Sequence, residues 1–93
     1  MTFDQACERL RIGKGSIRCD EVISILESLG FVVRRGSSGK HHTYIHPAFP
    51  IPMGANFNCP HRAGDPVLKS YVTRILGVLR HYESEIKDHL GEQ

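Results

Sequence analysis

The sequence predicts a small α+β fold in which helices cover one face of a three-stranded antiparallel sheet. Three observations lead to this class. Apolar residues recur at helical spacing at both ends of the chain, short β-branched runs occupy its middle, and glycine-rich or proline-rich turns separate them. Ninety-three residues suffice for one modest core. The predicted element order is therefore α-α-β-β-β-α.

The first two predicted elements are helices. Thr2 is placed as an N-cap with Gln5 three residues later, a capping-box arrangement, so a short helix is expected to about Leu10. A second helix is expected over residues 19–29, with Gly30 at the position where helices often end in glycine. The apolar stripes of the two helices consist of Phe3, Ala6, Cys7, Leu10 and of Val22, Ile25, Leu26, Leu29.

The middle of the chain predicts three strands. "FVVRR" at 31–35 is a β-branched run, "GSSGK" is a turn, and "HHTYIH" at 41–46 returns as the second arm of a hairpin. A third short strand is expected over 55–61. The connection before it is a loop, because a central strand does not tolerate repeated prolines; these are Pro47, Pro50 and Pro52.

Strand alternation divides the 41–46 segment into two sets of side chains. His41, Thr43 and Ile45 share one face, and the other face carries His42, Tyr44 and His46. Thr43 and Ile45 favour burial of the first set, with His41 at the strand's edge, but the sequence leaves both orientations open. If the second set pointed outward, it would form a stacking platform for RNA bases.

The last element predicts one long helix. Asp65 and Pro66 are expected at the N-cap and the first helical position, and the helix would continue to about Leu90. Its apolar stripe comprises Leu68, Val72, Ile75, Leu76, Leu79 and Ile86.

Composition and charge set the expected environment of the protein. No run of apolar residues is long enough to span a membrane, and the N-terminus lacks the apolar core of a signal peptide, so a cytoplasmic location is expected. Three widely spaced cysteines predict reduced, mostly buried thiols rather than a disulfide framework. The net charge of +2 is compatible with a polyanionic partner without requiring one.

From about Cys19 to Leu79 the chain resembles the HicA toxin family, also called YcfA-like proteins. The matching segments, in order, are "VISILESLGF" at 22–31, "GKHHTYIHP" at 39–47, "CPH" at 59–61 and "LKSYVTRIL" at 68–76. The resemblance implies a fold like that of double-stranded-RNA-binding domains. Residues 1–18 would then be an N-terminal extension, and residues 19–93 the HicA-like domain with an extended C-terminal helix. Lys40 departs from the family pattern, which usually has serine there.

The resemblance also implies an activity and two partners. Family members are endoribonuclease toxins that act on mRNA and are neutralised by a HicB-type antitoxin. The family's catalytic histidine maps onto His41, and a shift of one residue would select His42. Histidine suits such proton transfer because its ordinary pKa lies near neutral pH. The expected chemistry is metal-independent attack by the RNA 2′-hydroxyl, which leaves a 2′,3′-cyclic phosphate, and no cofactor is expected.

Basic residues around the hairpin are candidate phosphate ligands. Three of the candidates flank the histidine pair, and three others lie at the end of the third strand and in the last helix. The six candidates for RNA binding are Arg34, Arg35, Lys40, His61, Arg62 and Lys69. His46 is expected to be structural, and His81 and His89 to lie on the solvated surface of the last helix.

Other readings of the same residues remain open at this point. Cys59 and His61 could bind zinc with two of the hairpin histidines, but the spacing departs from zinc-knuckle patterns, so no metal is expected. Lys40 and the terminal additions also fit a non-catalytic RNA-binding or protein-interaction module. A third possibility is a domain that self-associates through its terminal helices.

Overall fold

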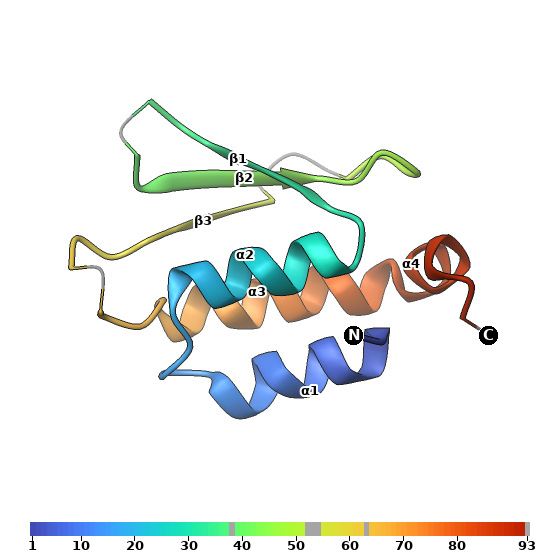
Figure 1. Ribbon diagram of the computed structural model, residues 1–93, viewed down its shortest axis with the longest axis horizontal. Helices are drawn as coiled ribbons and strands as arrows, with labels where there is room; N and C mark the ends of the chain where they lie inside the picture. Colours follow the sequence, from blue (N-terminus) through green and yellow to red (C-terminus); the bar gives the residue numbers. More distant parts are fainter. Residues whose placement is uncertain (38, 52–54, 63, 93) are drawn as a thin grey trace.

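The computed structural model describes residues 1–37, 39–51, 55–62 and 64–92. Its elements are α1 (Phe3–Gly13), α2 (Cys19–Ser28), β1 (Val32–Arg35), β2 (His41–Ile45), β3 (Asn56–Asn58), α3 (Lys69–His81) and α4 (Glu83–Leu90). The strands form one antiparallel sheet in the order β1-β2-β3. Helices α2 and α3 lie against one face of this sheet, and α1 lies on their far side (Figure 1). The predicted α+β class and element order are confirmed.

Helix α1 is tied into the body of the protein at its start. The Thr2 hydroxyl accepts a hydrogen bond from the Gln5 amide, and the Gln5 side chain accepts one from the Thr2 amide, so the predicted capping box forms. The Glu92 carboxylate accepts a further bond from the Phe3 amide at 3.1 Å. The helix runs to Gly13, beyond the predicted end at Leu10.

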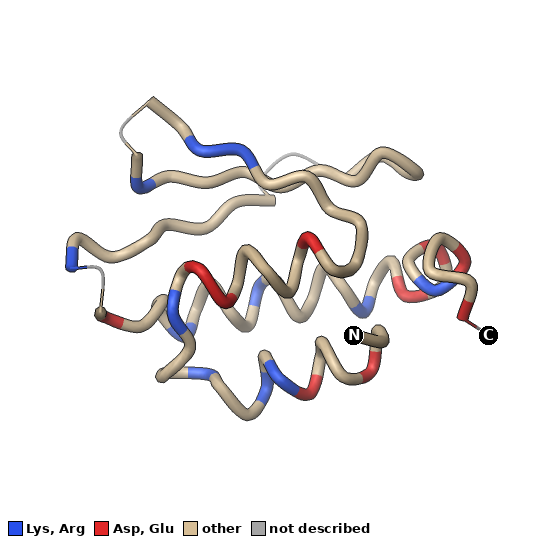
Figure 2. The backbone as a smooth tube through the Cα atoms, in the orientation of Figure 1, with Lys and Arg blue, Asp and Glu red and all other residues tan. Residues whose placement is uncertain are grey.

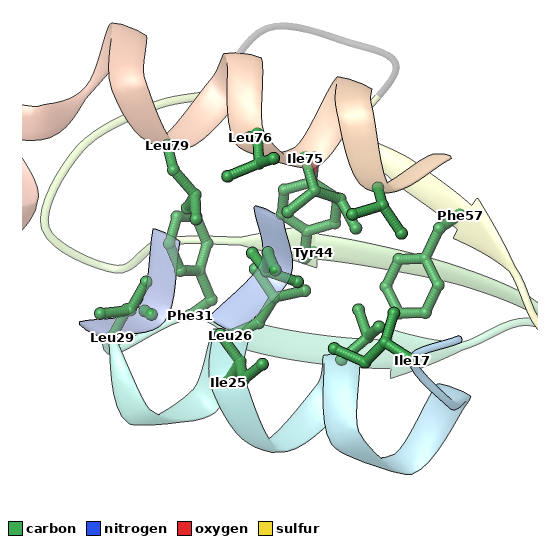
Figure 3. Close-up of a cluster of buried hydrophobic side chains, with 14 of the residues drawn as sticks. Ile17, Ile25, Leu26, Leu29, Phe31, Tyr44, Phe57, Ile75, Leu76 and Leu79 are labelled. Atoms are coloured by element: carbon green, nitrogen blue, oxygen red, sulfur yellow. The ribbon is translucent and has the colours of Figure 1, made fainter. Parts of the chain in front are cut away.

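The hydrophobic core lies between the sheet and the helices. Tyr44 and Phe57 project from the sheet toward Leu26 of α2 and Ile75 of α3 (Figure 3). Phe3, Ala6 and Leu10 extend the same core toward α1, and all of these side chains are almost completely buried. Burial of each Leu, Ile or Phe side chain in this core stabilises the fold by about 1.5–3 kcal/mol relative to its exposed state.

The structure reverses the predicted faces of β2. His42, Tyr44 and His46 are buried, whereas His41, Thr43 and Ile45 are exposed. The large Tyr44 ring decides the orientation, because it packs edge-on against Phe31 with ring centroids 5.7 Å apart. The prediction that the His41 side faces inward is therefore wrong, and the stacking platform of the other three side chains does not form.

The last helix differs from its prediction at two points. Pro66 is not at the helix start, because it pairs with Arg18 in an isolated β-bridge and the Val67 amide donates to the Ile17 carbonyl at 2.8 Å. Helix α3 begins only at Lys69. The expected continuous helix is also interrupted at Tyr82, which separates α3 from α4.

The remaining differences concern the cysteines and one loop. Cys19 and Cys59 form a disulfide across 40 positions of sequence, so the prediction of reduced thiols is wrong for this pair. The fold brings them together because α2 begins beside the end of β3; Cys7 is free and half-buried. The third strand is shorter than the predicted 55–61, and Pro52 of the proline-rich loop lies outside the described residues.

Candidate functional site

The β1–β2 hairpin presents its open end beside the end of β3. The turn closes through a hydrogen bond from the Gly36 amide to the His41 carbonyl, and Gly39 adopts a φ of 79°, which favours glycine. On the other side of β2, the Cys59 amide donates to the Lys40 carbonyl at 2.8 Å. Backbone pairing therefore fixes Lys40 and His41 between two neighbours.

His41 is exposed and oriented by a side chain across the sheet. It pairs with Asn58 in the β2–β3 register, and its Nδ1 lies 2.8 Å from Asn58 Oδ1. When Nδ1–H donates to this amide oxygen, Nε2 is the unprotonated nitrogen of the neutral ring. This arrangement is chemically able to accept a proton at Nε2.

Lys40, which precedes His41 in the sequence, is paired with His61. The Lys40 ammonium contacts both ring nitrogens of His61, with Nε2 at 3.1 Å. Because an ammonium can only donate, the ring nitrogen that accepts from it must be unprotonated. Lys40 therefore supplies a positive charge one residue before His41, and the hydrogen bond to its carbonyl fixes its backbone in the sheet.

The two hairpin arginines are on opposite faces of the sheet. Arg34 pairs with Thr43 and shares its exposed face with His41. Arg35 pairs with the buried His42 and lines a cavity of about 360 Å³ together with Arg18 and Arg62. The predicted phosphate ligands therefore separate into an outer-face group and a cavity group.

His42 is held in a different environment from its neighbour. It is 3% exposed, its ring stacks on Phe57 with centroids 5.3 Å apart, and Nδ1 lies 3.0 Å from the Lys40 carbonyl. The Cys59 Sγ atom is 3.4 Å from the same nitrogen. The ring packs within the fold rather than at its surface.

The other predicted residues have separate positions. The aliphatic part of Lys69 lies over Gly15, in the turn between α1 and α2. His81 and His89 are exposed, as expected. His46 is structural: Nε2–H donates to the Leu29 carbonyl at 3.0 Å, and Nδ1 accepts from the Ala48 amide at 3.1 Å.

The pKa of His46 is lowered from its ordinary value. Burial is the main cause, and the nearby His89 ring lowers the pKa further. The hydrogen bond to the Leu29 carbonyl acts in the opposite direction. The environment thus favours a neutral ring at this position.

Charge is unevenly distributed along the chain. No Asp or Glu occurs between Glu27 and Asp65, a segment that contains Arg34, Arg35, Lys40 and Arg62. In Figure 2 the charged positions along the described strands and their turns are accordingly all basic, whereas the acidic positions are on the helices, at Asp65 before α3 and at Glu92 after α4. Such a surface attracts phosphate groups.

None of the described helices combines the length and apolar character needed to cross a bilayer.

Two residues of this region were missed by sequence reasoning. Asn58 follows Phe57 in the alternation of the third strand, but its pairing with His41 depends on a register that the sequence does not specify. Arg18 precedes α2 and reaches the cavity only because the helix begins beside β3. The sequence carried no separate signal for either role.

Comparison with known proteins supports the resemblance found in the sequence. Neither a search of curated proteins nor a search of solved structures finds a match. A family model described as "HicA toxin of bacterial toxin-antitoxin" matches residues 19–86, which is most of the chain and includes every strand and the hairpin histidines. The match begins at the first residue of α2 and ends within α4. The chain therefore belongs to the HicA toxin family of bacterial toxin–antitoxin systems.

Proposed function

We propose that this protein is an endoribonuclease toxin in which His41 is the general base. The observation that carries the proposal is the exposed His41 ring, whose Nδ1 lies 2.8 Å from Asn58 Oδ1. The resemblance to the family also maps its catalytic histidine onto His41, with His42 as the alternative after a shift of one residue. His42 is disfavoured for this role because it is only 3% exposed and packs against Phe57.

The proposed reaction is transesterification within RNA. His41 Nε2 removes the proton from the 2′-hydroxyl, whose oxygen attacks the adjacent phosphorus and forms a bond to it. The bond from phosphorus to the 5′-oxygen breaks, and that oxygen takes up a proton as it leaves. The Lys40 ammonium stabilises the negative charge that develops on the phosphoryl oxygens. DNA is not cleaved because it has no 2′-hydroxyl.

Binding of the RNA backbone is assigned to two groups of hydrogen-bonding and basic side chains. Arg34 is on the exposed face with His41, and His61 contacts Lys40 at its edge. Arg35 and Arg62 line the cavity on the other side of the hairpin. Lys69 lies over the α1–α2 turn and is assigned a peripheral contact at most. Phosphate contacts of this kind position the strand without reading its sequence.

The proposed regulator is a HicB-like antitoxin. An acidic surface on that partner would complement the acid-free segment between Glu27 and Asp65. Val32 and Ile45 pair with each other on the exposed sheet face and are 41% and 48% exposed, so they offer apolar contacts beside the cations. A partner seated there would cover His41 and block RNA.

The test is cleavage of a synthetic single-stranded RNA in buffer containing EDTA. Wild-type protein should yield 2′,3′-cyclic phosphate ends, and His41→Ala should form them about 10²–10⁴-fold more slowly. His81→Ala, an exposed histidine on α3, is the matched control and should cleave like wild type. An RNA with a single 2′-deoxy substitution at the cleaved position should be resistant. Equal cleavage by wild type and His41→Ala would refute the assignment.

A second candidate function is favoured by one observation. Lys40 stands where the family usually has serine, which changes the group next to the proposed base. Salt-dependent RNA binding without any cleavage product would select a non-catalytic RNA-binding module.

A further inference from the structure

We propose that Cys19, Cys59 and His42 form a binding site for zinc or a similar soft divalent cation when the disulfide is reduced. One ligand atom from each residue lies within 4.8 Å of the other two. Among the described residues, this is the group whose His, Cys, Asp and Glu atoms converge as metal ligands would. The inference goes beyond the proposed ribonuclease activity, whose proposed base, His41, is on the other face of β2.

Three separate elements bring the ligands together. Cys19 is the first residue of α2, His42 is the second residue of β2, and Cys59 directly follows β3. The two cysteine Cα atoms are 5.6 Å apart, and Cys59 Sγ lies 3.4 Å from His42 Nδ1. In a tetrahedral zinc site with bonds of about 2.0–2.3 Å, neighbouring ligand atoms lie roughly 3.5–3.8 Å apart. Small side-chain rotations of the separated sulfurs would meet that geometry.

The hydrogen bonding of His42 is compatible with metal coordination through Nδ1. In the disulfide form, Nδ1 lies 3.0 Å from the Lys40 carbonyl. That carbonyl also accepts from the Cys59 amide at 2.8 Å, so it keeps a partner when Nδ1 turns to a cation. Stacking on Phe57 with an interplanar angle of 10° restricts the ring and lowers the entropic cost of coordination.

The surrounding charges suit two thiolates rather than two thiols. Arg18, Arg35 and Arg62 line the cavity that Cys19, His42 and Cys59 also line. Guanidinium groups stabilise thiolates, as does the start of a helix, where Cys19 lies. A divalent cation with two thiolates and a neutral imidazole has no net charge, so the arginines do not oppose it. The cavity leaves room for water or Asp20 as a fourth ligand.

The change between the two states balances in atoms and electrons. A dithiol reductant transfers two electrons and two protons to the Cys19–Cys59 disulfide and is itself oxidised to a disulfide. The two protein thiols then release two protons to solvent as they bind the divalent cation. The disulfide and the metal site are therefore mutually exclusive uses of the same sulfur pair.

The experiment is titration of the full chain with Co²⁺, after reduction by a dithiol and removal of the reductant without oxygen. We expect one Co²⁺ per chain, with intense thiolate-to-metal charge-transfer absorption that Zn²⁺ abolishes. Cys19→Ser and Cys59→Ser should lose this absorption, and Cys7→Ser should keep it. His42→Phe, which retains a ring against Phe57, should bind at least about tenfold more weakly. An absence of absorption in the reduced wild type, or its retention in Cys19→Ser, would overturn the proposal.

A second measurement guards against variants that fail to fold. Alkylation of reduced wild-type protein with and without Zn²⁺ can be mapped at each cysteine. Zn²⁺ should slow modification of Cys19 and Cys59 at least tenfold while the rate at Cys7, which is outside the site, stays unchanged. Equal rates at all three cysteines with and without Zn²⁺ would overturn the proposal. RNA cleavage in EDTA is a separate result, so failure of the metal site and failure of the proposed activity are distinguishable.

Discussion

The two faces of β2 place the same residue type, histidine, in two different environments. His41 and His42 are adjacent in sequence, yet one is exposed beside Asn58 and the other is 3% exposed against Phe57. Strand alternation alone produces this difference. The outward face carries the groups suited to chemistry, and the inward face carries the rings of His42, Tyr44 and His46, which are buried in the fold. Composition cannot reveal that division, because it depends on orientation.

The largest effect is expected at the outward histidine. His41→Ala should lower the rate of RNA cleavage by about 10²–10⁴-fold, the usual contribution of a positioned acid or base. Because the side chain is exposed, the free energy of unfolding should change by no more than about 0.5 kcal/mol. Cleavage assays and urea denaturation on the same preparation measure both quantities. A large loss of stability in this variant would contradict the separation of the two faces.

The inward neighbour should show the opposite profile. His42→Ala removes a buried ring that stacks on Phe57, so we expect a loss of about 2–4 kcal/mol in the free energy of unfolding. Urea denaturation of the oxidised protein measures it, with the disulfide intact in both samples. At temperatures where the variant stays folded, its cleavage rate should exceed that of His41→Ala. A more severe catalytic defect in folded His42→Ala would transfer the role of base to His42.

The end of the inward face should respond to acid. The pKa of His46 is lowered, chiefly by burial, so the unfolded chain takes up this proton at a higher pH than the folded one. The contribution of the neutral His46 ring to the free energy of unfolding is fully present above the pKa of the unfolded chain, about 6.5. It is lost as the pH falls through the pKa of His46 in the folded chain. Protonation would also place a hydrogen on Nδ1, where it faces the Ala48 amide.

The measurement for His46 is urea denaturation between pH 7.5 and 5. One proton limits the slope to about 1.4 kcal/mol per pH unit. His46→Gln should lose this part of the pH dependence, whereas His81→Gln, at an exposed site, should keep it. If the free energy of unfolding depended on pH identically in wild type and His46→Gln, His46 would not be the origin of the pH dependence.

The sequence predicted local features better than contacts between distant segments. The capping box of Thr2 and Gln5 and the helix ending before Gly30 depend on neighbouring residues, and both form as predicted. Thr43 and Ile45 favour the wrong face of β2, because the larger Tyr44 ring, on the opposite face, is the side chain that the core buries. A strand of alternating mixed polarity leaves that choice to tertiary packing.

Errors at the helix start and in the cysteines have the same physical origin. Asp65 and Pro66 carry a strong local signal for a helix start, but pairing of Pro66 with Arg18 overrides it. The Cys19–Cys59 contact spans 40 positions and exists only after α2 and β3 have met. Of the candidate site, the sequence identified the imidazoles and most of the cations. It could not identify Asn58, which depends on strand register.

The smallest effect is expected in the middle of the inward face, at Tyr44. Its ring is 1% exposed, and its hydroxyl has no hydrogen-bond partner among the described residues. An unpaired buried hydroxyl costs free energy, so Tyr44→Phe should stabilise the fold by about 1 kcal/mol. Tyr71→Phe, on the half-buried side of α3, is the matched control and should change stability less. Urea denaturation at neutral pH distinguishes the two.

High pH provides an independent check on the same hydroxyl. Burial raises the pKa of Tyr44 to about 12, so the unfolded chain releases this proton first, near pH 10. The contribution of the protonated Tyr44 hydroxyl to the free energy of unfolding is fully present below about pH 10. It is lost as the pH rises through the pKa of Tyr44 in the folded chain, because ionisation favours the unfolded chain. Tyr44→Phe should therefore lose less stability than wild type between pH 9 and 11. If the free energy of unfolding fell equally with pH in the two proteins, the Tyr44 hydroxyl would be in contact with water. The inward face of β2 would then be more accessible to solvent than the exposed fractions of its side chains indicate.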